Sequence, residues 1–315
     1  MKIAILGGGS WGTALAVHLA KNNQELKVWE FFSEQAKEMQ ERRYCRLLPE
    51  VRLPKQVFVS DSLPEVLVGS ELVLVAVPSD KVETVVQQAA QLIQSQPVII
   101  CSKGFASNLR LLSEAVSEKV NGNVFCLYGP THAEEVGKGM FSGIVLAGGH
   151  GKEQLKELFE NEALIVELSD DLIGVQVAAA LKNILAVFVG VLDGMELGDN
   201  AKAFLITKGL EEIRQVGMSL GAKSETFNGL AGIGDIIVTC GSKHSRNRYV
   251  GQEVGKGRKL EEVIKEMSMV AEGVTTVKNA FMLKEKLGLK LPLITGVHNI
   301  LFENKNPLEV LREIR

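Results

Sequence analysis

The sequence predicts an α/β protein in which a doubly wound parallel sheet, over residues 1–170, is followed by an all-α domain, over residues 171–315. Three observations lead to this prediction. A glycine-spaced strand–turn–helix unit opens the chain, short apolar runs separated by polar segments recur as far as residue 170, and helical periodicity takes over beyond it. The length of 315 residues also suits two domains of ~150 residues each.

The chain opens with a strand, a glycine-rich turn and a helix. The apolar residues 3–6 predict a buried strand, and residues 13–20 predict a helix. Between them, Gly7, Gly9 and Gly12 follow the spacing G-x-G-x-x-G. Gly7 permits the sharp turn, Gly9 lets a pyrophosphate approach the backbone, and Gly12 lets the helix pack closely on the strand. The amides at the start of the helix would then point at the phosphates.

An acidic residue completes this unit. A second predicted strand, residues 26–29, ends at Glu30, where a carboxylate typically holds the ribose hydroxyls of the adenosine. Strand, glycines, helix, strand and acidic residue occur in the order that a Rossmann-type dinucleotide-binding domain requires, so we predict this fold and this ligand for residues 1–170. The alternative is a tight turn without a ligand, in which three glycines would cost backbone entropy without a gain in packing.

The rest of the first domain alternates strands with helices. A polar helix over 33–39 is followed by a segment, 42–54, whose arginines and prolines predict a loop. Ser79 and Asp80 are predicted to cap a helix, and a polar helix covers 152–160. Further apolar runs bring the total to about seven or eight strands: residues 57–59, 71–78, 97–102, 124–128, 143–147 and 164–168.

Two strand ends carry candidate site residues. Lys103 directly follows the strand 97–102, and the carboxyl ends of parallel strands are where α/β sheets bind ligands. Gly129 and Thr131 follow the strand 124–128, and Thr131 also suits the N-cap of a helix. The alternatives are a solvated loop lysine and a threonine that only caps. The neighbouring dinucleotide motif favours a functional lysine.

The second domain opens with a long apolar helix that contains a lysine. Residues 173–192 are apolar nearly all round, which predicts a buried helix, and Lys182 and Asn183 interrupt them. A buried lysine is costly unless it is paired or functional. Burial lowers the pKa of a lysine and would let Lys182 exchange protons near neutral pH. The alternative is a structural lysine with a hidden carboxylate partner.

Further polar residues lie downstream, at predicted helix starts. The glycine-spaced stretch 227–235 is predicted to be a turn that delivers Asp235, although such a turn can also be a simple N-cap. Ser245, Arg246 and Asn247 stand at the start of the next helix. Charge, fork geometry and free amides converge there and predict a phosphate pocket. The alternative is a solvated basic helix start.

Composition excludes several classes of protein. The net charge of −3 argues against a protein that coats nucleic acid, and no apolar stretch reaches the ~18 uncharged residues of a membrane span. The four cysteines are scattered without C-x-x-C spacing, which is typical of a reduced, cytoplasmic protein. The five histidines show no metal-ligand spacing, so we predict no metal site. We therefore expect small-molecule ligands, no nucleic acid and no membrane insertion.

Taken together, these residues resemble those of a known family, the bacterial cytoplasmic glycerol-3-phosphate dehydrogenases that use NAD(P). The resemblance runs along the whole chain through motifs that occur in order: GGGSWGTALA, AVPS, SKG, GPTHAEEV, GVQVAAALKNILA, GDNAKAFLITKGL, GLAGIGDIIVTC, SRNRYVG and AEGVTT. It implies reversible hydride transfer between NAD(P)H and dihydroxyacetone phosphate, giving sn-glycerol 3-phosphate for phospholipid synthesis. The oligomeric state stays open, with a homodimer as one candidate.

The resemblance also implies roles for individual residues. Lys182 would be the general acid/base, and Lys103 would touch both cofactor and substrate and add positive charge beside the reacting oxygen. The expected substrate contacts are Lys103, Gly129, Thr131, Lys182, Asp235, Ser245, Arg246 and Asn247. The expected cofactor contacts, which include the three glycines of the motif, are Gly7, Gly9, Ser10, Trp11, Gly12, Glu30, Phe31, Lys103, Ala133, Arg246, Val270 and Glu272.

The sequence departs from the family at the end of the second strand. Many members carry basic residues there, which meet the 2′-phosphate of NADP, whereas this chain has Glu30, Phe31 and Phe32. A carboxylate hydrogen-bonds a ribose hydroxyl but repels a phosphate dianion, so we predict a preference for NAD(H) over NADP(H). Nearby arginines could still favour NADPH: Arg42, Arg43 and Arg46.

Two other functions fit the sequence. One is a dehydrogenase of the same architecture that acts on a carboxylate, such as ketopantoate or a 3-hydroxy acid, because Arg246 could pair with a carboxylate equally well. The other is a non-catalytic module that reports the redox state of a nucleotide to a partner. A buried Lys182 argues against the sensor, since a sensor needs no proton donor.

Overall fold

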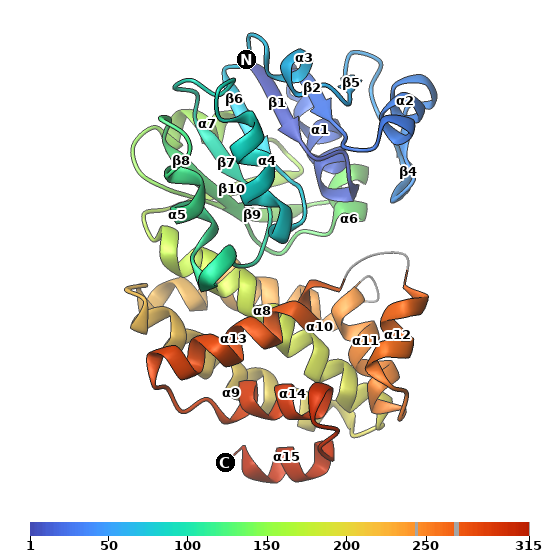
Figure 1. The fold of residues 1–315 in the computed structure, drawn as a ribbon, viewed down its shortest axis with the longest axis vertical. Coiled ribbons are helices and arrows are strands. Elements are labelled where there is room, and N and C mark those ends of the chain that lie inside the picture. The colour runs from blue at the N-terminus through green and yellow to red at the C-terminus, as the bar shows by residue number, and fades with distance from the viewer. Residues whose placement is uncertain (243–244, 268–270, 315) are drawn as a thin grey trace. The chain divides into compact units, whose positions relative to one another are not determined.

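The computed structural model describes residues 1–242, 245–267 and 271–314 of the chain. The chain divides into two compact units: unit 1, Met1–Leu172, and unit 2, Ile173–Arg315. Unit 1 is a doubly wound α/β unit of Rossmann type, and unit 2 is helical throughout its described residues (Figure 1).

Unit 1 is built on one eight-stranded sheet. Its strand order is β10-β9-β8-β7-β6-β1-β2-β5, and neighbouring strands are parallel except for β8 and β9. The chain winds outward from β1 in both directions, so the strand order reverses between β1 and β6, which is where doubly wound sheets bind ligands. The strands are β1 Lys2–Leu6, β2 Glu25–Trp29, β5 Phe58–Ser60, β6 Leu72–Val75, β7 Val98–Ile100, β8 Val124–Tyr128, β9 Ser142–Ala147 and β10 Leu164–Ser169.

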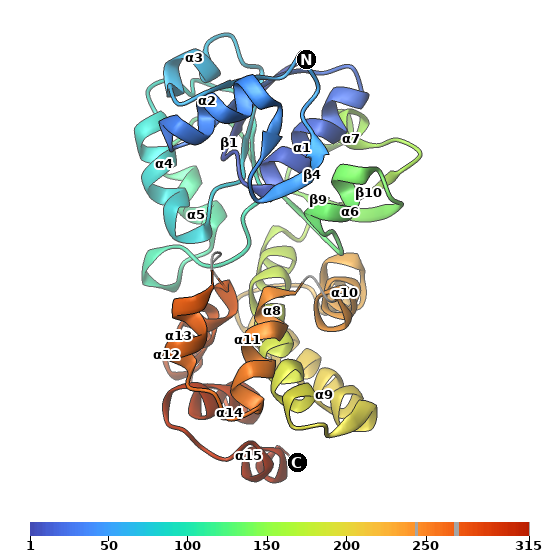
Figure 2. The same cartoon turned by 90° about the vertical axis from the view of Figure 1, so that its right-hand side faces the viewer.

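Helices cover both faces of this sheet, which explains why its central strands are continuous apolar runs. Figure 2 shows α4 and α5 on one face, and α1 with α6 and α7 on the other. The helices are α1 Ser10–Lys21, α2 Ser33–Arg42, α3 Leu63–Leu67, α4 Val82–Ala89, α5 Leu112–Ser117, α6 Ala133–Lys138 and α7 Lys152–Phe159, with short 3₁₀ turns η1 Ser79–Lys81 and η2 Ser107–Leu109.

The register of the parallel strands aligns their carboxyl ends. Leu6 lies beside Trp29 and Val75 in the two neighbouring strands, and Val75 lies beside Ile100. The residues that follow these ends therefore collect at one edge of the sheet, and they begin with Gly7, Glu30, Ala76 and Cys101. The glycine motif, Glu30 and the segment that carries Lys103 thus leave the same edge.

The loop predicted over residues 42–54 is instead a β-hairpin. Its strands, β3 Tyr44–Cys45 and β4 Leu48–Arg52, pair antiparallel. Their apolar side chains join the core of unit 1, and β4 packs against α1 and α6. The arginines and prolines of this segment concealed a short alternation of buried and exposed positions, because only a few apolar residues mark it.

Two predicted helix caps are not formed. Ser79 and Asp80 lie in the 3₁₀ turn that precedes α4, and neither side chain caps that helix. Thr131 does not cap α6, whose N-cap residue is His132. The Thr131 hydroxyl instead donates to the carbonyl oxygen of Gly129, at 3.3 Å. Both hydroxyl-bearing segments therefore belong to strand-end loops and not to the helices that follow.

Unit 2 is organised around the long helix α8, Leu172–Gly194. By length and composition α8 could cross a membrane, with a mean hydropathy of 2.0, but 89% of that apolar window is buried inside the protein. Its apolar character is therefore that of a core helix. The other helices are α9 Gly198–Ser219, α10 Asp235–Gly241, α11 Arg246–Gly255, α12 Leu260–Glu266, α13 Glu272–Leu287, α14 Pro292–Phe302 and α15 Pro307–Glu313, with η3 Ser224–Asn228 (3₁₀) and η4 Leu230–Gly234 (π).

Glycines let α8 and α11 approach at backbone distance. A Cβ atom on Gly251 of α11 would lie 1.8 Å from the carbonyl oxygen of Val187, and one on Gly190 of α8 would lie 2.0 Å from that of Arg248. Glycine is therefore required on both helices at this crossing. The crossing fixes the first turn of α11 relative to the middle of α8, and both segments carry predicted site residues.

Candidate active site

The turn between β1 and α1 has the geometry of a phosphate-binding turn. Gly7 has φ of +121°, and a Cβ there would lie 2.8 Å from the Ala76 carbonyl. A Cβ on Gly12 would lie 1.9 Å from the carbonyl oxygen of Gly7, so helix and turn are in close contact. Gly9 differs from both, because nothing lies within 4 Å of a Cβ built on it. The open side of Gly9 is where a pyrophosphate could approach the backbone.

The start of α1 suits an anion. Among the described residues no side chain caps this helix, whose N-cap is Gly9, and its first turn holds no acidic residue. Ser10 and Trp11 form that first turn, so their amides and the positive end of the helix dipole face the turn. The indole Nε1 of Trp11 is buried and has no hydrogen-bond partner among the described residues. An indole nitrogen in this state is a donor available to a ligand.

Glu30 lies against the glycine turn. It is buried, its Oε1 accepts from the backbone amide of Phe32 at 3.1 Å, and its Oε2 would lie 2.8 Å from a Cβ on Gly8. Burial raises the pKa of the Glu30 carboxyl, and the surrounding backbone amides partly oppose this shift. Phe31 and Phe32, in edge-to-face contact with ring centroids 5.1 Å apart, are both exposed beside it.

The arginines that follow Glu30 in the sequence are held by this chain's own groups. The guanidinium of Arg43 donates to the carbonyl oxygens of Gln40 and Pro54. Arg42 and Arg46 both pair with Glu38, at 3.1 Å for Arg42. Arg43 therefore has a structural role in the α2–hairpin segment, and one carboxylate already balances part of the charge of the other two.

Lys103, Gly129 and Thr131 meet at one carbonyl group. The Nζ of Lys103 donates to the Gly129 carbonyl oxygen at 3.1 Å, and the amide of Thr131 donates to the same oxygen at 2.8 Å. The backbone beside Lys103 is fixed in turn, because the Tyr128 hydroxyl donates to the Ser102 carbonyl oxygen at 2.6 Å. Three of the predicted substrate contacts are thus assembled in unit 1. Ala133 begins α6, directly after them.

Lys182 is buried in α8 and paired with Asp235. Its Nζ donates to Asp235 Oδ1 at 2.5 Å and to Thr239 Oγ1 at 2.7 Å. Lys182 is 5% exposed and Asp235 is fully buried. The carboxylate partner that the structural alternative required is therefore present, and it is itself a predicted substrate contact. An opposite charge at this distance favours the ammonium form of Lys182, the form that can donate a proton.

Thr239 is a further candidate site residue, which the sequence did not point to. Its hydroxyl accepts from Lys182 and donates to the backbone carbonyl oxygen of Asp235, at 2.6 Å. The signal was the spacing, since positions four residues apart share a helix face. The segment before Asp235 also differs from its prediction: residues 230–234 form a π-helix that runs into α10, and not a turn.

The start of α11 presents the remaining predicted substrate contacts. Ser245 is the N-cap, and its hydroxyl accepts from the amide of Arg248 at 3.3 Å. Arg246 is exposed in the first turn. Asn247 Oδ1 accepts from the amide of Gly273 at 2.9 Å, and a Cβ on Gly273 would lie 3.0 Å from the carbonyl oxygen of Asn183. The α11 start therefore adjoins the turn of α8 that carries Lys182.

Two predicted residues lie near the start of α13. Glu272 is its first residue and precedes Gly273, which Asn247 contacts. Val270 lies outside the described residues. Within the described ranges, no three His, Cys, Asp or Glu side chains gather as a metal-binding group. The groups described are a dinucleotide-type turn, a buried lysine–aspartate pair and a helix start with an arginine.

Comparison with known proteins covers nearly the whole chain. The family profile for the N-terminus of NAD-dependent glycerol-3-phosphate dehydrogenase matches residues 2–154, and the profile for its C-terminus matches residues 171–312. A glycerol-3-phosphate dehydrogenase [NAD(P)+] of Fusobacterium nucleatum is 40% identical, over 100% of this chain and 96% of its own length. One of Geobacillus thermodenitrificans is 41% identical, over 98% and 93%.

A solved structure agrees with these sequence relatives. The crystal structure of a glycerol-3-phosphate dehydrogenase from Coxiella burnetii matches this fold with a TM-score of 0.95 at 34% identity, over 99% of this chain and 98% of that chain. Profiles, relatives and structure extend across both units. The chain belongs to the family of NAD-dependent glycerol-3-phosphate dehydrogenases.

Proposed function

We propose that this protein interconverts dihydroxyacetone phosphate and sn-glycerol 3-phosphate, with NAD(P)H as the hydride donor for the reduction. The observation that carries the proposal is the buried ion pair of Lys182 with Asp235, 2.5 Å apart, in a chain of this family. A carbonyl reduction needs one hydride and one proton. A paired ammonium in a buried setting can give that proton, and a purely structural helix has no need of one.

The residues that fit the cofactor are those of the β1–α1 turn. Gly9 leaves room at the turn, α1 offers uncapped amides, and Glu30, beside the turn, would accept hydrogen bonds from a ribose diol. Phe31, exposed beside Glu30, offers a flat apolar face for the adenine. When bound, the reduced cofactor supplies the hydride that reaches C2 of the substrate.

Lys182 would give its proton to the C2 oxygen during reduction and take it back during oxidation. Asp235 and Thr239 hold the Nζ in place through their contacts of 2.5 and 2.7 Å. Lys103, fixed on the Gly129 carbonyl, would add positive charge near the same oxygen. At the other end of the substrate, Arg246 and the first amides of α11 would hold the phosphate.

The proposed cofactor preference follows from Glu30 and from the contacts of the arginines that come after it in the sequence. We propose that NAD(H) is preferred, because a carboxylate repels the 2′-phosphate of NADP(H). Arg43 is bound to backbone carbonyl oxygens, and Glu38 pairs with both Arg42 and Arg46, so these arginines offset the repulsion only in part. Comparison of kcat/KM for NADH and NADPH tests this, and an advantage for NADPH would contradict it.

The test of the proposed function is NADH oxidation by the purified protein with dihydroxyacetone phosphate, followed by absorbance. Ketopantoate and a 3-hydroxy acid with NAD⁺ serve as comparison substrates, because Arg246 could also pair with a carboxylate. We expect turnover with the phosphorylated ketone alone. Turnover only with a carboxylate, or NADH binding without turnover on any substrate, would contradict the proposal.

The cellular role follows from the reaction. We propose that the product supplies glycerol phosphate for phospholipid synthesis, and that the protein works in the reducing cytoplasm. All four cysteines are buried and unpaired, which suits that compartment: Cys45, Cys101, Cys126 and Cys240. We propose a homodimer as the working assembly, and sedimentation of the purified protein would measure it.

A further inference from the structure

The loop that begins with Lys103 has a strained backbone. Gly104 has φ of +153°, and Asn108 and Leu109 have φ of 58° and 62°. Left-handed backbone at a leucine is unfavourable and persists only where the surroundings hold it. The loop closes on itself through a bridge between Phe105 and Leu111. It still needs support from outside, because a closed turn by itself does not fix its position on the sheet edge.

Glu83 supplies that support from α4. Its Oε2 accepts from both the backbone amide (3.1 Å) and the hydroxyl of Ser107, and its Oε1 accepts from Arg110 Nη2 at 2.8 Å. One carboxylate thus binds the loop at two positions, on either side of the left-handed residues. The Ser107 contacts and the nearby guanidinium lower the pKa of Glu83, so it stays ionised at neutral pH.

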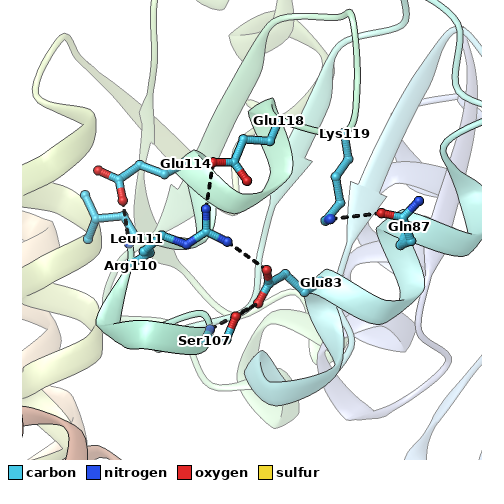
Figure 3. Close-up of polar contacts among 8 residues, drawn as sticks. All are labelled: Glu83, Gln87, Ser107, Arg110, Leu111, Glu114, Glu118 and Lys119. Atoms are coloured by element: carbon cyan, nitrogen blue, oxygen red, sulfur yellow. Dashed lines mark hydrogen bonds and ion pairs between the residues drawn. The ribbon is translucent and has the colours of Figure 1, made fainter.

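Arg110 connects this contact to the next helix. Figure 3 shows its guanidinium between two carboxylates, with Nη2 on Glu83 and Nη1 on Glu118 at 2.7 Å. Glu118 lies directly after α5, so Arg110 joins the loop to α4 and to the end of α5. The side chains of Arg110 and Glu83 are 30% and 25% exposed, which leaves the pair only partly screened by water.

The start of the loop packs on the same side. A Cβ on Gly104 would lie 2.5 Å from the Ser79 hydroxyl oxygen, in the turn that leads into α4. The loop is therefore anchored toward α4 at Gly104 and again at Ser107 and Arg110. Lys103 stands immediately before the first of these anchors, and its Nζ reaches the Gly129 carbonyl oxygen from there.

We propose that Glu83, Ser107 and Arg110 form a positioning cluster, which holds the loop so that Lys103 reaches its working place at the sheet edge. This inference rests on the role proposed above for Lys103. None of the three residues needs to touch substrate or cofactor. They act through the loop backbone, and a displacement of about 1 Å at a catalytic group can cost as much as 10²-fold in rate.

The chain offers a matched control for this cluster. Lys119 Nζ donates to Gln87 Oε1 at 2.9 Å, so this pair also links α4 to the end of α5 but does not touch the loop (Figure 3). The test compares Glu83→Ala, Arg110→Met and Lys119→Met. We expect the first two to lose about 10-fold in kcat/KM for dihydroxyacetone phosphate, and Lys119→Met to stay at the wild-type value.

Two further measurements separate positioning from a general loss of stability. Amide hydrogen exchange should speed up over residues 103–111 in Glu83→Ala, and not in Lys119→Met. In a double-mutant cycle, adding Glu83→Ala to Lys103→Met should cost no further activity, because the cluster acts through Lys103. Arg110→Lys should recover part of the loss. If Glu83→Ala folds poorly, Glu83→Gln, which keeps the shape and loses the charge, takes its place.

The outcomes distinguish this inference from the function it rests on. If Lys103→Met keeps its wild-type kcat/KM, the proposed role of Lys103 is wrong and the inference falls with it. If Lys103→Met is impaired but Glu83→Ala and Arg110→Met behave like Lys119→Met, only the inference is overturned. Multiplying losses in the double variant would also overturn it, since the cluster would then act by another route.

Discussion

Removal of the carboxylate beside Lys182 gives the sharpest test of the proposed chemistry. Asp235→Asn keeps the shape of the side chain and removes its charge, so the ammonium of Lys182, 5% exposed, loses the carboxylate that lies 2.5 Å away. Breaking a buried pair in this way costs about 3–5 kcal/mol. Loss of the Lys182 proton limits this cost to the upper part of that range, because deprotonating a lysine with an ordinary pKa of about 10.4 costs about 4.6 kcal/mol at pH 7.

In the variant, Lys182 either stays charged without the Asp235 carboxylate or loses its proton, and the second outcome gives the variant a characteristic pH dependence. If Lys182 becomes neutral in the folded variant, its folded pKa lies below its unfolded one, and stability rises with pH up to about 10.4. We therefore expect the stability gap between Asp235→Asn and wild type to shrink as pH is raised. A neutral lysine gives no proton, so we also expect kcat for reduction to fall by about two to four decades and to recover partly at lower pH.

Urea unfolding across pH and the pH profile of kcat measure both effects. The double variant Lys182→Met with Asp235→Asn is the control, since it removes both charges: it should regain most of the lost stability and stay inactive. An Asp235→Asn protein with the stability and pH profile of wild type would refute the reasoning, because the pair would then contribute nothing through its burial.

Three further predictions concern other parts of the structure. Arg246→Ala should raise KM for dihydroxyacetone phosphate by about 10- to 150-fold, the value of one charge-assisted hydrogen bond, with a smaller change in kcat; an unchanged KM would remove Arg246 from the phosphate site. Burial raises the pKa of Glu30, so lowering the pH should protonate its carboxylate at a higher pH than that of an ordinary glutamate. The ratio of kcat/KM for NADPH to kcat/KM for NADH should then rise. In Glu30→Gln this ratio should be raised at every pH and should not vary with the titration. Burial lowers the pKa of His18, whose Nε2 lies 2.6 Å from the Phe159 carbonyl oxygen. The stability that this neutral histidine contributes is therefore fully present above its unfolded pKa of about 6.5 and is lost as the pH falls from there toward its folded pKa. Urea midpoints should show this loss in wild type and less of it in His18→Gln.

Local signals account for what the sequence predicted well. The glycine spacing is dictated by distances of a few ångströms within one turn, such as the contact between Gly12 and the Gly7 carbonyl. The central strands are recognisable because both faces are buried, which makes their sequences continuously apolar. The family assignment added the order of motifs along the whole chain, and the profiles and relatives confirm it.

Contacts between distant segments account for what the sequence missed. Lys182 and Asp235 are 53 residues apart. The sequence therefore predicted a buried lysine in one segment and an aspartate after a glycine-rich stretch in another, but it did not show that the two form a pair. Thr239 carried no motif of its own. The hairpin of β3 and β4 was missed because its few buried side chains pack on α1 and α6, helices whose positions only the fold supplies.

Sequence alone also leaves the part played by three arginines undecided. Arg42, Arg43 and Arg46 follow Glu30 closely in the sequence, which makes them candidates for binding a 2′-phosphate. Arg43 instead donates to backbone carbonyl oxygens, and Glu38 accepts from the other two. How strongly such a cation can attract a ligand depends on the contacts that it already makes within the protein, and the fold determines those contacts.

Two buried acids, one in each unit, show how differently a buried negative charge can be stabilised. Asp235 lies 2.5 Å from the ammonium of Lys182, and this close contact offsets the cost of burying the pair. Glu30 has no cation within ion-pair distance among the described residues and accepts from backbone amides, so burial still raises the pKa of its carboxyl. A carboxylate in that state gains from further neutral donors, and the two hydroxyls of a ribose supply them. A phosphate monoester in place of one hydroxyl would bring a second anion to a carboxylate already short of positive charge. The preference for NAD(H) is thus expected from the lack of a cation beside Glu30 among the described residues. Proton donation by Lys182 is expected from the ammonium that lies beside Asp235.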